Sequence, residues 1–239
     1  MKNSTAKLQP SGVSSDGYLT HHLLKTRQNK RQSLLSVEEL HDRYEALKPE
    51  ITKRLDEFKK VSSNDYFYEL AYCLLTPQSS AVNAGKAVTA LRKKNFQKKK
   101  FNPEALLYQK DYYIRFHKTK AKHLVEMKDN FPLIARELSN GNASVELREW
   151  LMKNVKGLGW KEASHFLRNI GHKNLSILDR HILKNLIRCG VLKQLPKSLT
   201  TKEYMRIEIL FLKFAERVNI TMDELDLLFW SMETGQILK

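Results

Sequence analysis

The sequence has little cysteine and no long hydrophobic run. Its 239 residues include only two cysteines, Cys73 and Cys189, which excludes a disulfide scaffold. Two thiols are also too few for an iron–sulfur cluster or a zinc site built from cysteines within one chain. No apolar run approaches the length of a membrane span, and the N-terminus lacks the apolar core of a signal peptide. We therefore expect a soluble protein of the cytoplasm.

Glycine and proline are also scarce, at 9 and 6 residues, which is few for a β-sandwich or barrel. No stretch alternates cleanly between apolar and polar residues, as a half-buried strand does. Apolar residues instead recur at helical spacing, and capping-box patterns at residues 36–39, 200–203 and 221–224 begin three helices. The sequence predicts an all-α fold of about eight to ten helices, with a kink or break at Pro49.

Acidic residues are too few to balance the basic ones. Lys and Arg number 42 against 26 Asp and Glu, so the formal net charge is +16. This excess favours a polyanionic partner such as nucleic acid or an anionic membrane surface, although a basic surface without such a partner is the alternative. Residues 1–35 are polar and basic with little apolar periodicity, which predicts a flexible tail before one domain at 36–239.

The most informative segment is residues 151–171, which read LMKNVKGLGWKEASHFLRNIG. Gly157 and Gly159 permit a tight turn with positive φ and a close backbone approach. Their amides precede an amphipathic helix, where free N–H groups and the helix dipole attract an anion. This pattern is typical of a helix–hairpin–helix, which holds a DNA phosphate without reading base sequence. An ordinary turn between two helices is the alternative.

Two residues after this turn suggest chemistry. Lys161 lies at the start of the helix, where the dipole disfavours its charged form and makes a neutral, nucleophilic amine more accessible. Asp179 follows a short apolar run and is placed to cap the next helix, which also fixes its carboxylate. A carboxylate there can accept a proton or stabilise a developing sugar cation. The alternatives are a solvated or phosphate-binding lysine and a purely structural cap.

Four stretches resemble the helix–hairpin–helix DNA glycosylase superfamily, and more narrowly its archaeal-type 8-oxoguanine DNA glycosylase/lyases, the second Ogg family. They are CLLTPQSSAVNAGKAV at 73–88, KGLGWKEASHFLRNIG at 156–171, ILDRHIL at 177–183 and LDLLFWSMETGQILK at 225–239. The resemblance implies two helical lobes with the active site in the cleft between them. It departs from the superfamily in having no proline between Gly171 and Leu178, and it lacks the iron–sulfur cysteines of the endonuclease III branch.

The resemblance also implies roles for individual residues. Lys161 corresponds to the Schiff-base lysine and Asp179 to the catalytic aspartate of the family. Gln78 lies in the loop that fills the gap left by a flipped base. The C-terminal stretch contributes to the lesion pocket, with Trp230 stacking on the extruded base and Asp226 accepting from its Watson–Crick edge. The α-carboxylate of Lys239 would face N7, which carries a hydrogen in 8-oxoguanine but not in guanine.

The remaining expectations concern DNA. The hairpin amides at Gly157 and Gly159 would hold a phosphate. Further candidates for phosphate contacts are Lys156, Arg180, Lys153 and Arg168, although a solvated face explains any one of these four equally well. Residues 115–118 interleave charged and aromatic side chains, but a plain loop is the simpler interpretation. No cofactor is expected, although hairpin carbonyls leave a monovalent cation open.

The expected partner is double-stranded DNA containing 8-oxoguanine, bound by a monomer. The expected activity is excision of 8-oxoguanine through a lysine Schiff base, followed by strand cleavage 3′ to the abasic site. Two alternatives stay open: a glycosylase for another damaged base, and a non-catalytic hairpin module that recruits a partner to DNA.

Overall fold

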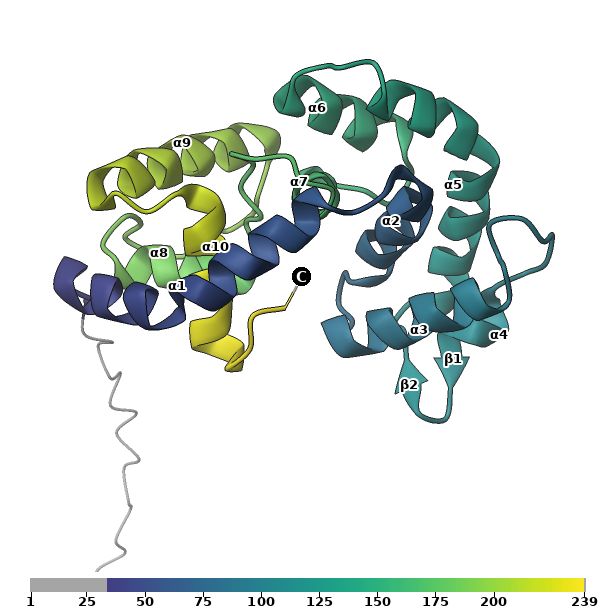
Figure 1. The fold of residues 1–239 in the computed structure, drawn as a ribbon, viewed down its shortest axis with the longest axis horizontal. Coiled ribbons are helices and arrows are strands. Elements are labelled where there is room, and N and C mark those ends of the chain that lie inside the picture. The colour runs from purple at the N-terminus through teal and green to yellow at the C-terminus, as the bar shows by residue number, and fades with distance from the viewer. Residues whose placement is uncertain (1–33, 239) are drawn as a thin grey trace, which may run out of the picture. The chain divides into compact units, whose positions relative to one another are not determined.

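The computed structural model describes residues 34–238. The predicted tail at 1–35 therefore lies almost wholly outside the described residues, as does Lys239. The described part is helical apart from one short hairpin, which confirms the all-α prediction (Figure 1). Its elements are α1 (Val37–Lys59), a 3-10 turn (Ser63–Asp65), α2 (Tyr66–Leu75), α3 (Ala81–Lys93), α4 (Glu104–Leu107), β1 (Tyr108–Gln109), β2 (Tyr112–Tyr113), α5 (His117–Leu138), α6 (Ser144–Asn154), α7 (Trp160–Asn169), α8 (Arg180–Arg188), α9 (Thr201–Val218) and α10 (Met222–Thr234).

Local capping explains where several helices begin. The predicted boxes at the starts of α1 and α10 are both formed: Ser36 and Glu39 exchange side chain–backbone hydrogen bonds, and so do Thr221 and Glu224. The side chain of Thr200 caps α9. Such caps satisfy backbone N–H groups that have no partner within the helix, and each contributes about 1 kcal/mol.

Of the kink or break predicted at Pro49, the break does not occur. Helix α1 continues through this residue to Lys59, and α5 likewise contains Pro132. Proline removes one hydrogen bond to the carbonyl four residues earlier, here that of Glu45. Both Pro49 and Glu45 lie on the exposed face of α1, where water can bind the released carbonyl. The buried residues of α1 meanwhile hold both halves of the helix against α10 and α7.

The hairpin of β1 and β2 was not expected from the sequence. Tyr108 pairs with Tyr113 and Gln109 with Tyr112, so each strand has only two residues. A strand this short has no room for the alternating pattern by which strands are recognised in a sequence.

The buried apolar side chains form two clusters. The first core is built from α2, α3, α5, α6 and α7, with Leu107 of α4, and the second core from α1, α8, α9 and α10. Helix α7 joins them, because Phe166 and Leu167 belong to the first core while Trp160 packs against the second. The two cores correspond to the two helical lobes expected for this fold. Among the described residues, no helix is both long and apolar enough to cross a membrane.

Candidate active site

The predicted helix–hairpin–helix is present, formed by α6, residues 155–159 and α7. Gly157 adopts φ +93°, a region that favours glycine, and a Cβ there would collide with the ring of His123. The turn is closed by a 3.1 Å hydrogen bond from Leu158 N to the Val155 carbonyl. The Gly159 amide donates to Glu162 Oε2 at 3.2 Å, so this amide already has an acceptor within the hairpin.

Lys161 is the second residue of α7, and its Nζ lies 3.1 Å from Glu162 Oε1. Its side chain is 29% exposed, half-buried at the wall of a cavity of about 200 Å³. Asp179, Asp226 and Trp230 line the same cavity. Four side chains singled out in the sequence, spread over residues 161–230, therefore come together at one site.

Asp179 is the N-cap of α8, as predicted, and both of its carboxylate oxygens are engaged. Oδ1 accepts from the backbone amides of His181 at 2.8 Å and Ile182 at 2.9 Å. Oδ2 accepts from the indole N–H of Trp230 at 2.8 Å. Asp179 therefore caps α8 and lines the cavity at the same time, and the cap fixes the orientation of its carboxylate.

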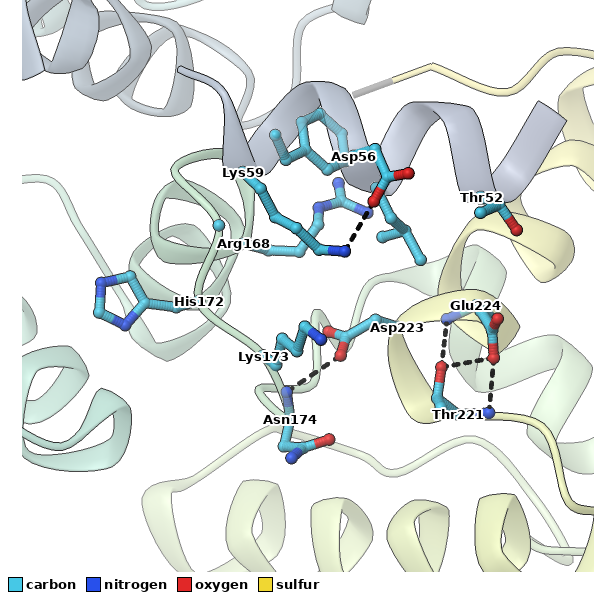
Figure 2. Close-up of a pocket in the computed structure, with 13 residues that line it drawn as sticks. Thr52, Asp56, Lys59, Arg168, His172, Lys173, Asn174, Thr221, Asp223 and Glu224 are labelled. Carbon is cyan, nitrogen blue, oxygen red and sulfur yellow. Dashed lines mark hydrogen bonds and ion pairs between the residues drawn. The ribbon is translucent and has the colours of Figure 1, made fainter. Parts of the chain in front are cut away.

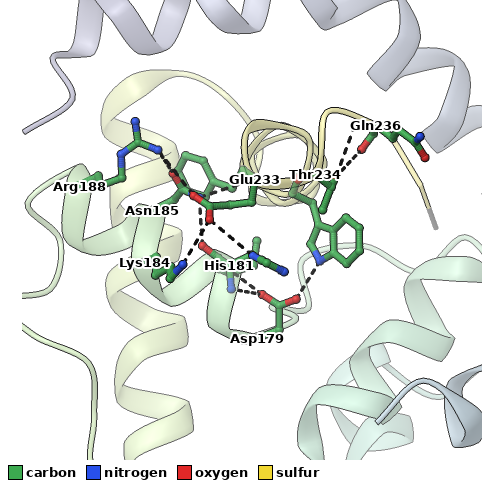
Figure 3. A network of polar contacts seen from close by, with 11 residues as sticks. Asp179, His181, Lys184, Asn185, Arg188, Glu233, Thr234 and Gln236 are labelled. Carbon is green, nitrogen blue, oxygen red and sulfur yellow. Dashed lines mark hydrogen bonds and ion pairs between the residues drawn. The ribbon is translucent and has the colours of Figure 1, made fainter. Parts of the chain in front are cut away.

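A network of polar contacts holds α8 against α10 (Figure 3). Glu233 of α10 lies 3.5 Å from Lys184 Nζ and 3.7 Å from both His181 Nδ1 and Arg188 Nη1. Asn185 Nδ2 also donates to the Phe229 carbonyl at 3.3 Å. Since Asp179 begins α8 and Trp230 belongs to α10, these contacts maintain the geometry of the Asp179–Trp230 hydrogen bond.

Asp226 is buried and paired with Arg168 of α7, with 2.8 Å between Oδ2 and Nη1. Burial raises the pKa of Asp226 to about 7; Arg168 opposes this rise, while Asp179 and Asp223 add to it. Asp226 Oδ1 has no hydrogen-bond partner among the described residues. The suggested phosphate contact of Arg168 is wrong, because its guanidinium is buried in this ion pair and beside the Phe58 ring.

A second cavity of about 360 Å³ lies on another side of Arg168 (Figure 2). It is lined by α1, residues 171–174 and the start of α10, and neither Lys161 nor Asp179 reaches it. Asp223 in its wall accepts from the Asn174 amide at 3.1 Å, and burial raises the pKa of this carboxyl. Because Lys161 and Asp179 both line the smaller of these two cavities, that cavity is the candidate active site.

The predicted DNA contacts lie outside the cavity. Gln78 is exposed in the loop between α2 and α3 and has the left-handed φ of +55°. Lys156 of the hairpin is exposed and lies 3.6 Å from Glu126, and Arg180 is the exposed first residue of α8. The C-terminal segment reaches the cavity at Leu238. The expected role of Lys239 concerns a residue outside the described part and stays a prediction.

Residues 115–118 do not form a plain loop throughout. His117 begins α5, and Phe116 before it is exposed with a left-handed φ of +59°. The Arg115 guanidinium lies 4.9 Å from the centre of the Phe116 ring.

Several cavity residues were missed in the sequence. Tyr72 and Thr76 lie in or just after the apolar segment of α2, where they resemble ordinary core residues. His165 carries a usable signal, because it follows Lys161 by one helical turn and so lies on the same face of α7. Its ring centre is 5.8 Å from that of Tyr72.

Comparison with known proteins agrees with this geometry. The family model described as 8-oxoguanine DNA glycosylase matches residues 51–220. An 8-oxoguanine DNA glycosylase/AP lyase of Fusobacterium nucleatum is 42% identical over 212 residues, covering 84% of this chain and 96% of the relative. A protein of the same name from Korarchaeum cryptofilum is 40% identical over 190 residues, covering 79% of this chain and 90% of the relative.

Solved structures show the same fold. The Methanocaldococcus jannaschii 8-oxoguanine glycosylase/lyase, in complex with 15mer DNA containing 8-oxoguanine, has a TM-score of 0.74 and 33% identity, covering 84% of this chain and 99% of that one. The Thermotoga maritima 8-oxoguanine DNA glycosylase also has a TM-score of 0.74, with 32% identity, and the match covers 85% and 98% of the two chains. The hairpin and the cavity lined by both Lys161 and Asp179 agree with these similarities. The chain belongs to the 8-oxoguanine DNA glycosylase family of the helix–hairpin–helix fold.

Proposed function

We propose that this chain excises 8-oxoguanine from DNA with Lys161 as the nucleophile and then cuts the strand 3′ to the resulting abasic site. The observation that carries this proposal is the single cavity that Lys161 and Asp179 share with Trp230 and Asp226. The relatives named 8-oxoguanine DNA glycosylase/AP lyase combine the same two activities. A base in a duplex must leave the stack to reach such a cavity.

The chemistry assigned to Lys161 is nucleophilic substitution at the sugar. Its neutral amine bonds to C1′ while the bond from C1′ to N9 breaks, and the purine leaves with the electron pair and takes up a proton. Opening of the sugar ring gives the imine between C1′ and Nζ. Loss of a C2′ proton then expels the 3′ phosphate by β-elimination. Glu162 beside Nζ is placed to hold the ammonium until its proton departs.

Asp179 supports this reaction as a fixed negative charge. Its three hydrogen bonds prevent rotation, so the carboxylate needs no reorganisation as positive charge develops on the sugar. Trp230 is oriented by the same contact, and its ring face is the proposed stacking surface for the base. A cavity of about 200 Å³ is smaller than the roughly 300–1,000 Å³ of sites for drug-sized ligands, which suits one extruded base.

Base recognition is assigned to Asp226 and Lys239. The unpartnered Oδ1 of Asp226 supports a bond to the Watson–Crick edge, and a pKa near 7 allows this carboxyl to be either acceptor or donor around neutral pH. The phosphate contacts are assigned to the hairpin at Gly157 and Gly159, together with Lys156 and Arg180. The Gly159 amide would have to exchange Glu162 for the phosphate. DNA is the partner, and we propose that the chain acts on it as a monomer at the nucleoid in the cytoplasm.

Borohydride trapping on a duplex with one 8-oxoguanine tests the nucleophile. Wild type should give a covalent complex, and Lys161→Gln should give none, because an amide cannot form the imine. Lys213→Gln is the matched control, since Lys213 is an exposed lysine of α9 outside the cavity. DNA binding without any trapped complex would favour the non-catalytic hairpin module. Trapping on oxidised pyrimidines but not on 8-oxoguanine would favour a glycosylase for another base.

A further inference from the structure

Lys120 is a buried lysine to which the reaction assigns no part. It lies in the first turn of α5 and is 6% exposed. Its Nζ donates to the Leu75 carbonyl at 2.7 Å, the Pro77 carbonyl at 2.6 Å and Ser79 Oγ at 3.3 Å. These three bonds match the three donors of an ammonium group, and all three acceptors belong to the segment that leaves α2.

A charge in this position is expensive. The pKa of Lys120 is lowered to about 8, mainly by burial and also by the positive charge of Lys161, while Glu162 opposes the shift. An apolar side chain of similar length would avoid this desolvation, but it would leave the Leu75 and Pro77 carbonyls without this donor. The partial negative charge at the C-terminus of α2, which ends at Leu75, offsets part of the cost.

The segment that Lys120 holds is short and strained. Gln78 has a left-handed φ of +55°, which non-glycine residues adopt only when the surroundings impose it. Thr76 and Ser79, on either side, line the cavity that contains Lys161. Ser79 Oγ also accepts from the Arg115 amide at 3.0 Å, so the same hydroxyl ties this segment to the turn before α5.

We propose that Lys120 is a positioning residue whose ammonium holds residues 76–79 in the conformation that presents Gln78 to DNA and forms part of the wall of the cavity that contains Lys161. The inference rests on the proposed function for its catalytic consequence. It assigns Lys120 no contact with the base or the sugar. Its effect should therefore appear in the extrusion of a base, and not in the reaction of a sugar that has no base to extrude.

The test compares two substrates in the same duplex context. Lys120→Met should slow excision of 8-oxoguanine by about tenfold or more, a barrier increase of at least 1.4 kcal/mol. Trapping at a pre-formed abasic site should stay within about threefold of wild type, because Lys161 remains intact. Lys122→Met, which removes an exposed lysine of the same helix, should leave both rates within about twofold. Equal losses on the two substrates would overturn the proposal.

A double-mutant cycle with Gln78→Ala adds a second criterion. If Lys120 acts through this loop, the double variant should excise no more slowly than the slower single variant. Multiplicative losses would contradict the proposal. Ser79→Ala removes one acceptor and the tie to Arg115, and it should give the same split between substrates in a milder form. Ser79→Ala replaces Lys120→Met in the test if Lys120→Met folds poorly.

Hydrogen exchange separates this proposal from the proposed function. The backbone amides of Thr76, Gln78, Ser79 and Ser80 should exchange faster in Lys120→Met than in wild type, while those in the middle of α10 stay unchanged. If wild type neither excises nor traps, the proposed function fails, and exchange alone then decides whether Lys120 holds the loop. Unchanged exchange at 76–80 would refute that role.

Discussion

Asp179 accepts three hydrogen bonds from two elements, and Trp230 supplies the one that comes from outside its own helix. At the scale of single residues, the site therefore depends on donors arranged around a carboxylate. Asp226 differs, since it has one strong partner in Arg168 and one oxygen without any among the described residues. The first carboxylate is held in place, whereas the second retains capacity for a ligand.

Asp179→Asn should reduce excision by about a hundredfold or more, the range expected when a catalytic charge is lost. Asparagine can keep its oxygen toward the α8 amides, but its NH₂ then faces the Trp230 N–H, another donor. The thermal midpoint should fall only by a few degrees. Single-turnover excision and thermal unfolding measure the two effects. Asp65→Asn, at a partly exposed N-cap position whose carboxylate makes no cap hydrogen bond, is the control. Excision by Asp179→Asn as fast as by wild type would refute the role of Asp179.

The raised pKa of Asp226 predicts a pH-dependent contribution to stability. The folded state holds a proton on this carboxyl more tightly than the unfolded state, whose pKa is near 3.8. The contribution is therefore fully present below pH 3.8 and is lost as pH rises through about 7. Asp226→Asn cannot titrate at this position. The free energy of unfolding of wild type, taken relative to that of the variant, should therefore fall from pH 5 to pH 8. Denaturant unfolding at both pH values measures it, and parallel curves would contradict the assignment.

At the scale of elements, the hairpin between α6 and α7 depends on its first glycine. Gly157→Ala combines an unfavourable positive φ with a collision at His123, so it should destabilise the protein by more than about 1 kcal/mol and weaken DNA binding. Gly141→Ala is the control, because φ there is +72° but a Cβ meets nothing within 4 Å.

His123→Ala offers a check on the Gly157 prediction. Added to Gly157→Ala, it should restore part of the lost stability, since it removes the ring that the new Cβ would meet. No rescue would mean that backbone strain, and not the collision, dominates.

At the scale of the whole molecule, the cavity lies where the two cores meet. Tyr72 and Thr76 come from the α2 side, whereas Asp226 and Trp230 come from α10 of the second core. The net charge of +16 complements DNA, and phosphate contacts of this kind release counterions.

Affinity for DNA should fall steeply with salt, and Lys156→Ala should reduce the slope of log affinity against log salt by about 0.9, the value of one phosphate contact. Lys48→Ala is the control, because Lys48 is also an exposed lysine beside a carboxylate, that of Glu45. Fluorescence anisotropy at several salt concentrations gives both slopes. An unchanged slope for Lys156→Ala would remove this residue from the DNA contacts.

Features encoded over a few residues could be predicted from the sequence. The caps at Ser36 and Thr221 depend on a partner three residues away, and the hairpin depends on glycines two apart. Lys161 and Asp179 were identified because each stands at the start of a helix with a local signature. The resemblance to a known family added Trp230, whose role no local pattern indicates.

Other features were decided only when distant segments packed together. Arg168 resembled a surface cation in the sequence, but it is buried in an ion pair with Asp226, 58 residues later. Pro49 suggested a kink or break, but α1 continues through it because packing holds both halves of the helix. Lys120 carried no signal, because its three acceptors lie 41 to 45 residues earlier in the chain. Capping and turn energies act within one helical turn and so are written in the local sequence. The desolvation of a buried charge depends on which groups surround it, which only the tertiary structure determines.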